Sequence, residues 1–428
     1  MNIKEISKKI IAGLQKRGAD HVAVTSDVTR MEELQFEFKE IDLLRSFTET
    51  KIIIKVIKDH KQATTIINQL SDEAIEIAMD SVIADAENSQ ADEAYAIAPK
   101  QKSGTFSVGP ETADRDRMYY LMDTFQEECL AKYPGLRLEG NISHYFATDS
   151  YINSNGVNYE QKRGGYAYMA MFSAREGKKA SSLNYTYGSY MDLEHTFWEV
   201  ALLRELIEQS IQSLDSKPVP ETFTGDVILV PSMVEEFMGS LINSQLTYRM
   251  ILTDNSVLKG KIGEQVLSKS ISVCSDPLDN ELAGGYFVTG DGFQAEKVDI
   301  FSEGVLKNYM LSYFGSRKTN LPMSKAGGCL VMKPGNEELA DMIKNTKKGL
   351  LVVRFSGGNP SLNGDFSGVA KNSFYIENGE IKYPVNETMI SGNLLEIFKN
   401  VKSISKNTIN SGHFKMPWIK CDGVTISN

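Results

Sequence analysis

The stretch Arg354–Gly392 reads RFSGGNPSLNGDFSGVAKNSFYIENGEIKYPVNETMISG. Glycines recur beside small polar residues, and the first half lacks the apolar alternation of an ordinary strand. Glycine tolerates positive φ and lets other groups approach the backbone closely, so this density predicts a loop shaped around a ligand. A set of tight surface turns would give the same pattern. The second half predicts a β-hairpin, because alternating apolar residues flank the turn Glu377-Asn378-Gly379.

Strand and helix patterns extend upstream of this stretch without strict alternation. GDVILV (Gly225–Val230) predicts a buried strand, and the helix after it is expected to begin with a capping box formed by Ser232 and Glu235. Because strands and helices are mixed but not in regular β-α-β order, the predicted fold class is α+β. Asp215–Pro220 interrupts all periodicity and predicts a boundary between two domains, 1–215 and 216–428. Each is expected to contain mixed or antiparallel sheet with packed helices.

The N-terminal half contains further recognisable elements. An amphipathic helix is predicted at the start of the chain, where Ile3, Ile6, Ile10 and Leu14 share one face. The remaining predicted helices cover residues 71–86, 112–132 and 192–214. Asn155-Gly156 predicts a hairpin turn.

Composition narrows the possible partners and locations. The chain of 428 residues has 56 acidic and 46 basic residues and a formal net charge of −10. A nucleic-acid-binding surface usually shows a basic stripe, and none is evident, so no nucleic-acid partner is expected. The N-terminal helix lacks the apolar core of a signal peptide, and no run approaches the roughly 18–20 apolar residues of a membrane span. Four widely spaced cysteines favour free thiols, so a cytoplasmic protein without a membrane partner is predicted.

Several separated blocks resemble the TldD/PmbA family, the so-called modulators of DNA gyrase. They are GDFSGVA at Gly364–Ala370, the IENGEI hairpin, ISGNLLEIF at Ile390–Phe398, FSEGVLKNYMLSYFGSRK at Phe301–Lys318 and VMKPGNEELADMI at Val331–Ile343. The resemblance runs from about Gly225 to the C-terminus and extends more weakly over KIIIKVIKDHKQATTIINQLS in the N-terminal half. It implies the two-domain fold of that family and membership of a metallopeptidase family.

The helix after Pro231 departs from the catalytic branch of this family. In the TldD branch the matching helix carries H-E-x-x-x-H, and the resemblance places its histidines at Val234 and Gly239 and its glutamate at Glu235. Neither Val nor Gly can bind a metal, whereas a peptidase zinc needs about three protein ligands. The third ligand of that branch is a cysteine near the C-terminus, where this chain has only His413 and Cys421 in different surroundings. The chain therefore resembles the TldE/PmbA branch, and no catalytic or metal-binding residue is predicted in it.

The resemblance implies a non-catalytic partner subunit of a cytoplasmic TldD/TldE-type zinc metallopeptidase that acts on unfolded proteins or peptides. The zinc is expected in a TldD-type partner, and a self-dimer is the alternative assembly. The segment around Gly357–Gly368 is the candidate peptide channel, since a peptide can add a strand to a sheet edge. Its candidate residues are Gly357, Gly358, Asn359, Gly364, Asp365, Phe366, Ser367 and Gly368.

Two other functions remain open from the sequence. One is a stand-alone peptide-binding protein that has no catalytic partner. The other is a peptidase with unrecognised catalytic residues. His195 and Glu199, four residues apart on a predicted helix, could share a metal, although such a pair is more often a surface contact.

Overall fold

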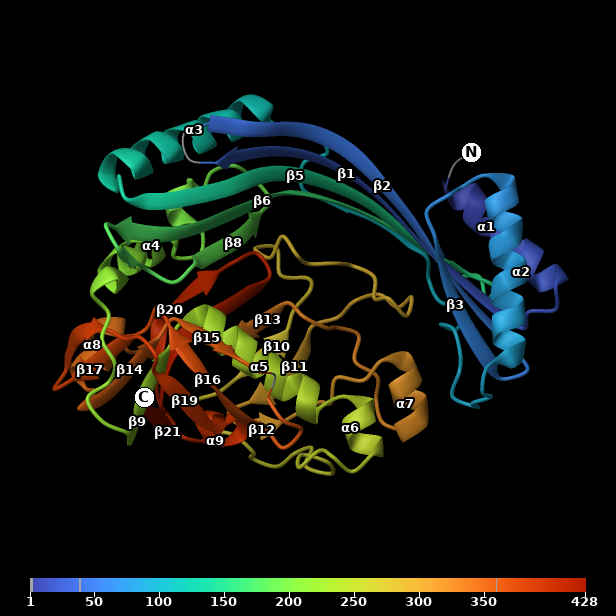
Figure 1. Cartoon of the computed structure of the whole chain (residues 1–428). Coiled ribbons are helices and arrows are strands. Elements are labelled where there is room, and N and C mark those ends of the chain that lie inside the picture. The colour runs from blue at the N-terminus through green and yellow to red at the C-terminus, as the bar shows by residue number, and fades with distance from the viewer. Residues whose placement is uncertain (1–2, 38–39, 359) are drawn as a thin grey trace.

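The computed structural model describes residues 3–37, 40–358 and 360–428. Helices accompany two large sheets, so the predicted α+β class is confirmed. Figure 1 shows the first sheet as a long curved arch and the second sheet, with its helices, lying beneath the concave side of that arch.

The first sheet has eight strands within the described residues, in the order β3-β2-β1-β5-β6-β4, with β7 and β8 also paired to β6. Its strands are β1 (His21–Glu37), β2 (Glu40–Lys58), β3 (Lys61–Ile67), β4 (Gly104–Val108), β5 (Leu136–Asn153), β6 (Asn158–Glu176), β7 (Lys179–Ala180) and β8 (Asn184–Tyr190). The pairing is antiparallel except for β4 against β6. The predicted turn at Asn155-Gly156 joins β5 to β6, as expected.

Helices pack at both ends of the arch (Figure 1). They are α1 (Ile3–Lys16), α2 (Asp72–Asn88), α3 (Arg115–Lys132) and α4 (Leu203–Gln212). Ile6, Ile10 and Leu14 form the buried face of α1, as predicted. The side chain of Ser71 caps α2 by accepting a hydrogen bond from the Ala74 N–H at 3.2 Å. Such caps stabilise a helix by about 1 kcal/mol because they satisfy an otherwise free N–H group.

The predicted helix 192–214 is wrong in its first half. Only a 3₁₀ turn at Phe197–Glu199 precedes α4, and a second one at Ser213–Asp215 follows it. Ala201 and Leu202 have φ of 38° and 67°, a left-handed conformation that breaks a right-handed helix. Glu199 accepts hydrogen bonds from Thr196 at the start of the 3₁₀ turn, so this carboxylate is engaged locally in a cap.

The second sheet has thirteen strands within the described residues. They are β9 (Phe223–Leu229), β10 (Val273–Ser275), β11 (Val298–Ser302), β12 (Val305–Leu306), β13 (Leu330–Met332), β14 (Lys348–Val352), β15 (Arg354–Gly357), β16 (Asp365–Lys371), β17 (Phe374–Glu377), β18 (Glu380–Pro384), β19 (Met389–Asn393), β20 (Val401–Asn410) and β21 (Phe414–Ser427). The helices of this half are α5 (Pro231–Gln245), α6 (Tyr248–Leu252), α7 (Tyr313–Thr319), α8 (Leu339–Lys344) and α9 (Leu394–Lys399). The central strand β21 pairs with β9, β13, β19 and β20.

The quoted stretch folds as two hairpins. β17 and β18 form the predicted one, with Asn378 and Gly379 at φ of 52° and 80°, as the favoured two-residue turn requires. β15 pairs with β16 and brings Gly357 opposite Gly368. A Cβ on Gly368 would lie 2.6 Å from the Phe355 ring, so this glycine makes room for an aromatic side chain.

One hydrophobic core runs through both sheets, from Leu34 and the buried face of α3 to Ile426 on β21. It includes Cys129 on α3, which is fully buried. A smaller core fills the far end of the arch between α1, α2 and β1–β3. All first-sheet strands precede residue 191 and all second-sheet strands follow residue 222, whereas the boundary at 215 stays a prediction. None of the described helices is long and apolar enough to cross a membrane.

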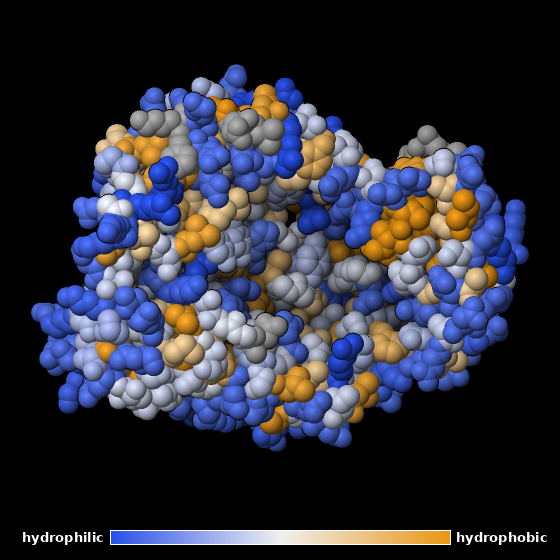
Figure 2. Space-filling model, viewed as in Figure 1, coloured by the Kyte–Doolittle hydropathy of each residue, from blue (hydrophilic) through white to orange (hydrophobic). Residues whose placement is uncertain are grey.

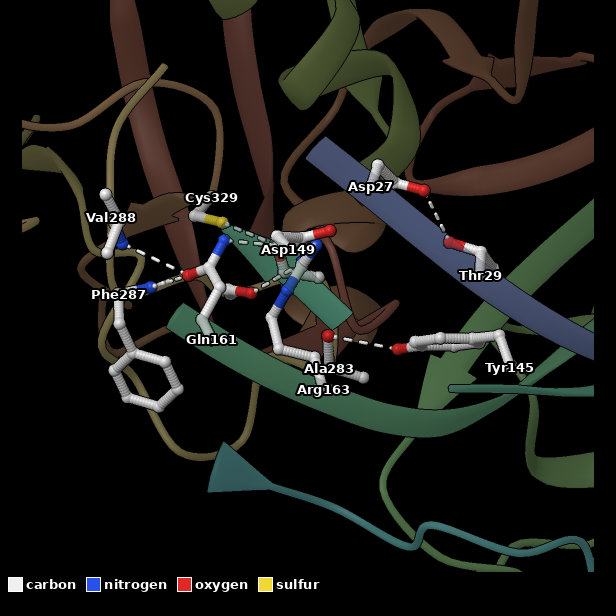
Figure 3. A network of polar contacts seen from close by, with 12 residues as sticks. Asp27, Thr29, Tyr145, Asp149, Gln161, Arg163, Ala283, Phe287, Val288 and Cys329 are labelled. Carbon is white, nitrogen blue, oxygen red and sulfur yellow. Dashed lines mark hydrogen bonds and ion pairs between the residues drawn. The ribbon is translucent and has the colours of Figure 1, made fainter. Parts of the chain in front are cut away.

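Tyr145, Asp149, Gln161 and Arg163, on the concave face of the arch, hold residues 283–288 of the second half through hydrogen bonds (Figure 3). We call this contact the clasp. Tyr145 donates to the Ala283 carbonyl and Arg163 to the Gly285 carbonyl, both at 3.1 Å. The side-chain oxygen of Gln161 accepts from the main-chain N–H groups of Phe287 and Val288 at 2.9 and 3.1 Å.

A carboxylate completes the clasp. Asp149 accepts from Arg163 at 2.9 Å and from Gln161 at 3.0 Å. Because side chains two residues apart on a strand share a face, β5 and β6 present these groups together. The clasp thereby fixes residues 283–288 under the arch.

Candidate functional site

Helix α5 has two faces of different character. Its inner face is apolar and buried against the second sheet, and it consists of Met233, Val234, Phe237, Met238 and Leu241. The opposite face carries Ser232, Glu235, Glu236, Gly239 and Asn243, which are exposed or half-buried. Spacings of three and four residues place this second set along one side of an α-helix.

The predicted capping box at the start of α5 is wrong. The helix begins at Pro231, the cap residue is Val230, and no side chain of the described residues caps this end. Proline is favoured at the first helical position, because its missing N–H would be free there in any case. Ser232 therefore lies inside the helix, and Glu235 is left to face the space beside it.

Two cavities flank this face of α5 and share Glu235. The first, of about 270 Å³, lies at the N-terminal end of the helix below β8, where Tyr185, Tyr187 and Arg354 line it. The second, of about 410 Å³, follows the helix past Gly239 to Asn243. Its opposite wall comes from four segments: Tyr286, Thr289–Asp291, Met310–Ser312, and Ser324 with Ala326–Gly328. We call the two together the α5 groove; Figure 2 shows that this side of the molecule is hollowed beneath the arch.

Arg354 is held against the arch rather than free in the groove. It donates to the Asn184 side-chain oxygen at 3.1 Å and to the Tyr185 carbonyl at 2.6 Å. Its guanidinium also lies over the Tyr185 ring, 3.6 Å from the ring centre. Such stacking on an aromatic face stabilises a cation by about 0.5–2 kcal/mol.

The surroundings of Glu235 and Glu236 disfavour the ionised forms of their carboxyl groups. Burial, followed by the charge of Glu236, raises the pKa of Glu235. Burial also raises the pKa of Glu236, and the charge of Arg354 acts against that rise. Burial first, and then the charge of Glu235, raise the pKa of Tyr187, which lines the same cavity as both glutamates.

A family model described as the PmbA/TldA metallopeptidase C-terminal domain matches residues 222–428, which include the second sheet and α5. A relative from Haemophilus influenzae, named Metalloprotease PmbA homolog, is 24% identical over 96% of this chain and 93% of its own length. Residues 222–428 therefore carry the C-terminal domain of the TldD/PmbA family, and the chain as a whole is similar to members of that family.

Two further comparisons agree with membership of the TldD/PmbA family. Metalloprotease PmbA of Escherichia coli O157:H7 is 26% identical over 298 residues, which are 66% of this chain and 64% of that protein. The crystal structure of TldE from Thermococcus kodakarensis superimposes with a TM-score of 0.83, covers 99% of this chain and 100% of its own, and is 18% identical. At that identity the superposition shows a common fold.

The side chains at the metal-motif positions of the TldD/PmbA family do not fit a zinc ion here. Val234 is fully buried in the core, and Gly239 offers no donor atom. In addition, α5 is a regular α-helix, so residues five apart point about 140° away from each other. Glu235 is the one member of the three with a ligating side chain, and no zinc-dependent step is derived for this chain.

The two candidate metal ligands near the C-terminus, Cys421 and His413, both make other contacts. Cys421 lies within β21, fully buried, and its thiol is 3.8 Å from the Val227 carbonyl oxygen. Burial strongly raises the pKa of this thiol, which opposes the thiolate form that binds metals. His413 is 3.2 Å from the Ser189 hydroxyl, and burial lowers its pKa.

The predicted peptide-channel residues lie on the β15–β16 hairpin, and the structure leaves their role a prediction. Phe366 is buried and packs against Phe237 of α5, with ring centres 5.0 Å apart. Asp365 accepts from Asn363 and Asn393, at 2.8 and 2.9 Å. The exposed candidates are Gly357, Gly358, Asp365 and Ser367. Gly364 and Gly368 are buried within the hairpin, and Asn359 lies outside the described residues. Arg354, at the start of this hairpin, lines the α5 groove.

Sequence reasoning missed the residues that line the first cavity together with Glu235. Tyr185 and Tyr187 come from a first-sheet strand about fifty residues earlier, and Arg354 comes from the second sheet. The available signal was local: Pro231 marks the first helical position, and it turns Glu235 away from a capping role. The alternation of tyrosines along β8 was a second signal, because it places Tyr185 and Tyr187 on one face of the strand.

Proposed function

We propose that this chain is the non-catalytic subunit of a cytoplasmic zinc metallopeptidase, in which a TldD-type subunit carries the metal. The complex acts on unfolded proteins or peptides, and this chain contributes a wall that holds the substrate. One observation carries the proposal: the motif helix is intact as α5, yet Val234 is a core residue and Gly239 has no side chain. The names of the relatives, metalloprotease and TldE, support it.

The α5 groove supports a substrate-holding role. Here the two cavities persist along the motif helix, and polar groups and tyrosines line them. In this proposal the domains are 1–215, which supplies the arch, and 216–428, which supplies α5.

The test compares the chain alone, a TldD-type relative from the same genome alone, and the two mixed. Metal analysis by plasma mass spectrometry and cleavage of casein or an unstructured peptide are measured for each. We expect no stoichiometric zinc and no cleavage with the isolated chain, and a stable complex with chelator-sensitive activity in the mixture. Tight zinc with activity in the isolated chain would refute the proposal.

A matched pair of variants tests which of the two subunits carries the catalytic glutamate. Replacing the glutamate of H-E-x-x-x-H in the partner removes the general base, so turnover should fall by about 10³-fold or more. Glu235→Gln in this chain should lower turnover by no more than about tenfold, the size of a lost binding contact. A loss as large as that of the partner variant would make Glu235 a catalytic residue.

A stand-alone peptide-binding protein is the second candidate, because the α5 groove lies within this chain alone. It is favoured if the genome encodes no relative with H-E-x-x-x-H, or if the two proteins do not co-purify. A self-dimer in place of the mixed pair would be seen by light scattering. A peptidase with unrecognised residues would show chelator-insensitive cleavage in a general peptide screen.

A further inference from the structure

We infer that the α5 groove selects extended peptides that carry a positive charge, and that Glu235 and Glu236 bind this charge. The inference rests on the proposed function, because it specifies which substrates the wall would hold. It concerns the charge of the ligand, which the family-level proposal leaves open.

The length of the groove fits a short extended segment. From Ser232 to Asn243 the lining face of α5 covers about 16 Å at 1.5 Å per residue. An extended chain rises about 3.3 Å per residue, so about five peptide residues span this distance. Gly239 keeps the middle of the groove open, since the nearest atom to a Cβ placed there is the Glu235 carboxylate oxygen, 3.7 Å away.

The charges along the groove are unbalanced. Among the described residues, the carboxylates of Glu235, Glu236 and Asp291 line it together with the guanidinium of Arg354. Asp291 already accepts a hydrogen bond from the Tyr313 N–H at 2.8 Å, so the two glutamates are the carboxylates left to a ligand. Arg354 is already committed to Asn184 and Tyr185 of the arch. Its charge opposes the effect of burial on Glu236, whereas both influences on Glu235 are unfavourable to its ionised form. A half-buried carboxylate beside a second carboxylate gains most from a cation that arrives with the ligand.

The aromatic wall suits the same ligand. Tyr187 lines the first cavity close to both glutamates, and its side chain is 48% exposed, so its ring is open to a ligand. Two residues away, Tyr185 already holds the guanidinium of Arg354 on its face. A lysine or arginine side chain, or the amino terminus of a peptide, would find carboxylates on one side and a ring on the other.

The experiment measures binding of fluorescent seven-residue peptides of Gly, Ser and Ala to the full chain by anisotropy. The acetylated, amidated peptides differ only at the central residue, which is Lys, Gln or Glu. A Gln peptide with a free amino terminus separates the two sources of positive charge. We expect the Lys peptide to bind at least tenfold more tightly than the Gln peptide, and the Glu peptide to bind most weakly.

Variants assign this preference to the groove. Glu235→Gln with Glu236→Gln should bring the Lys and Gln peptides to within twofold of each other. Glu73→Gln, at an exposed position of α2, is the matched control and should leave the preference unchanged. Gly239→Leu, which fills the middle of the groove, should weaken binding of every peptide by about tenfold.

The outcomes separate this inference from the proposed function. Equal binding of the three acetylated peptides, or a Lys preference that survives the double variant, overturns the inference even if the chain remains essential to its partner. Preference for the free amino terminus over lysine supports it and assigns the cation to the peptide end. Zinc-dependent cleavage by the isolated chain would overturn the proposed function while leaving the charge preference to be decided by the same binding data.

Discussion

The clasp and the α5 groove both lie between the arch and the second half of the molecule, and both contain carboxylates. In the clasp, Asp149 accepts from Arg163 and Gln161, and these side chains also bind the main chain of residues 283–288. In the groove, Glu235 has a second carboxylate beside it, and Arg354 is directed to the arch.

This difference separates polar groups that hold the fold from polar groups that are available to a ligand. In the clasp, Asp149 is paired with the Arg163 cation, so removing that partner is costly even though the nearby Asp27 carboxylate disfavours the Asp149 charge. A half-buried charge without a counter-charge lowers stability slightly and can be compensated on binding. The following changes test this distinction, beginning with the largest expected effect.

Arg163→Met should lower the free energy of unfolding by about 3 kcal/mol, because it leaves the largely buried Asp149 without its cation and removes the bond to Gly285. Urea unfolding followed by circular dichroism measures the loss. Arg30→Met is the control, since Arg30 and Glu111 form an exposed pair. A loss no larger than that of the control would mean that the clasp is not structural.

The double variant Val234→His and Gly239→His should lose about 2 kcal/mol, mainly because a polar imidazole replaces the fully buried Val234 side chain. It should gain no stoichiometric zinc, since the two positions point away from each other on a regular helix. Metal analysis after dialysis provides the measurement. One tightly bound zinc per chain would show that the helix can rearrange into a metal site.

Binding of the Lys peptide to the groove should weaken several-fold between pH 7.5 and about pH 5, an effect of about 1 kcal/mol. The pKa values of Glu235 and Glu236 are raised, so these groups take up protons at higher pH than ordinary carboxyl groups and then lose their attraction for the cation. Over this range Tyr187, whose pKa is raised, stays neutral.

The same titration on the Glu235→Gln, Glu236→Gln double variant serves as the control. Its affinity should be low and independent of pH. If the wild-type protein shows equal affinity at both pH values, the two carboxylates do not bind the cation.

Gly239→Ala should raise the free energy of unfolding by about 0.5 kcal/mol, the smallest effect in this series, because alanine restricts the unfolded chain and favours the helix. The space beside Gly239 accepts a methyl group, with the nearest atom 3.7 Å away. Thermal unfolding is sensitive enough to detect the change. Destabilisation instead would indicate that α5 needs flexibility at this position.

Local signals predicted much of the fold. The hairpin at Asn378-Gly379, the turn at Asn155-Gly156 and the amphipathic helices α1 and α2 depend on residues close together in the sequence. The break at Ala201–Leu202 was missed, because neither residue type normally adopts positive φ and only tertiary packing can impose it.

The site was predictable only in part. The resemblance places the metal motif at Val234 and Gly239, and side-chain chemistry then predicts that neither residue can bind a metal. The clasp could not be foreseen, because Gln161 and Arg163 bind main-chain groups of a segment more than a hundred residues later, and such groups leave no mark in the sequence. The role of Glu235 was assigned from a short local pattern that the proline at position 231 overrides.

The two deepest thiols provide a way to observe motion in each half of the molecule. Cys129 lies on the buried face of α3, and burial raises its pKa to about 12. Cys421 lies within β21, and burial also raises its pKa. Since only an exposed thiolate reacts readily, a maleimide reagent can label each cysteine only after its surroundings open transiently. Mass spectrometry of the labelled peptides would then give two separate opening rates, one for the arch and one for the sheet below it. Equal rates would mean that the protein unfolds as one cooperative unit.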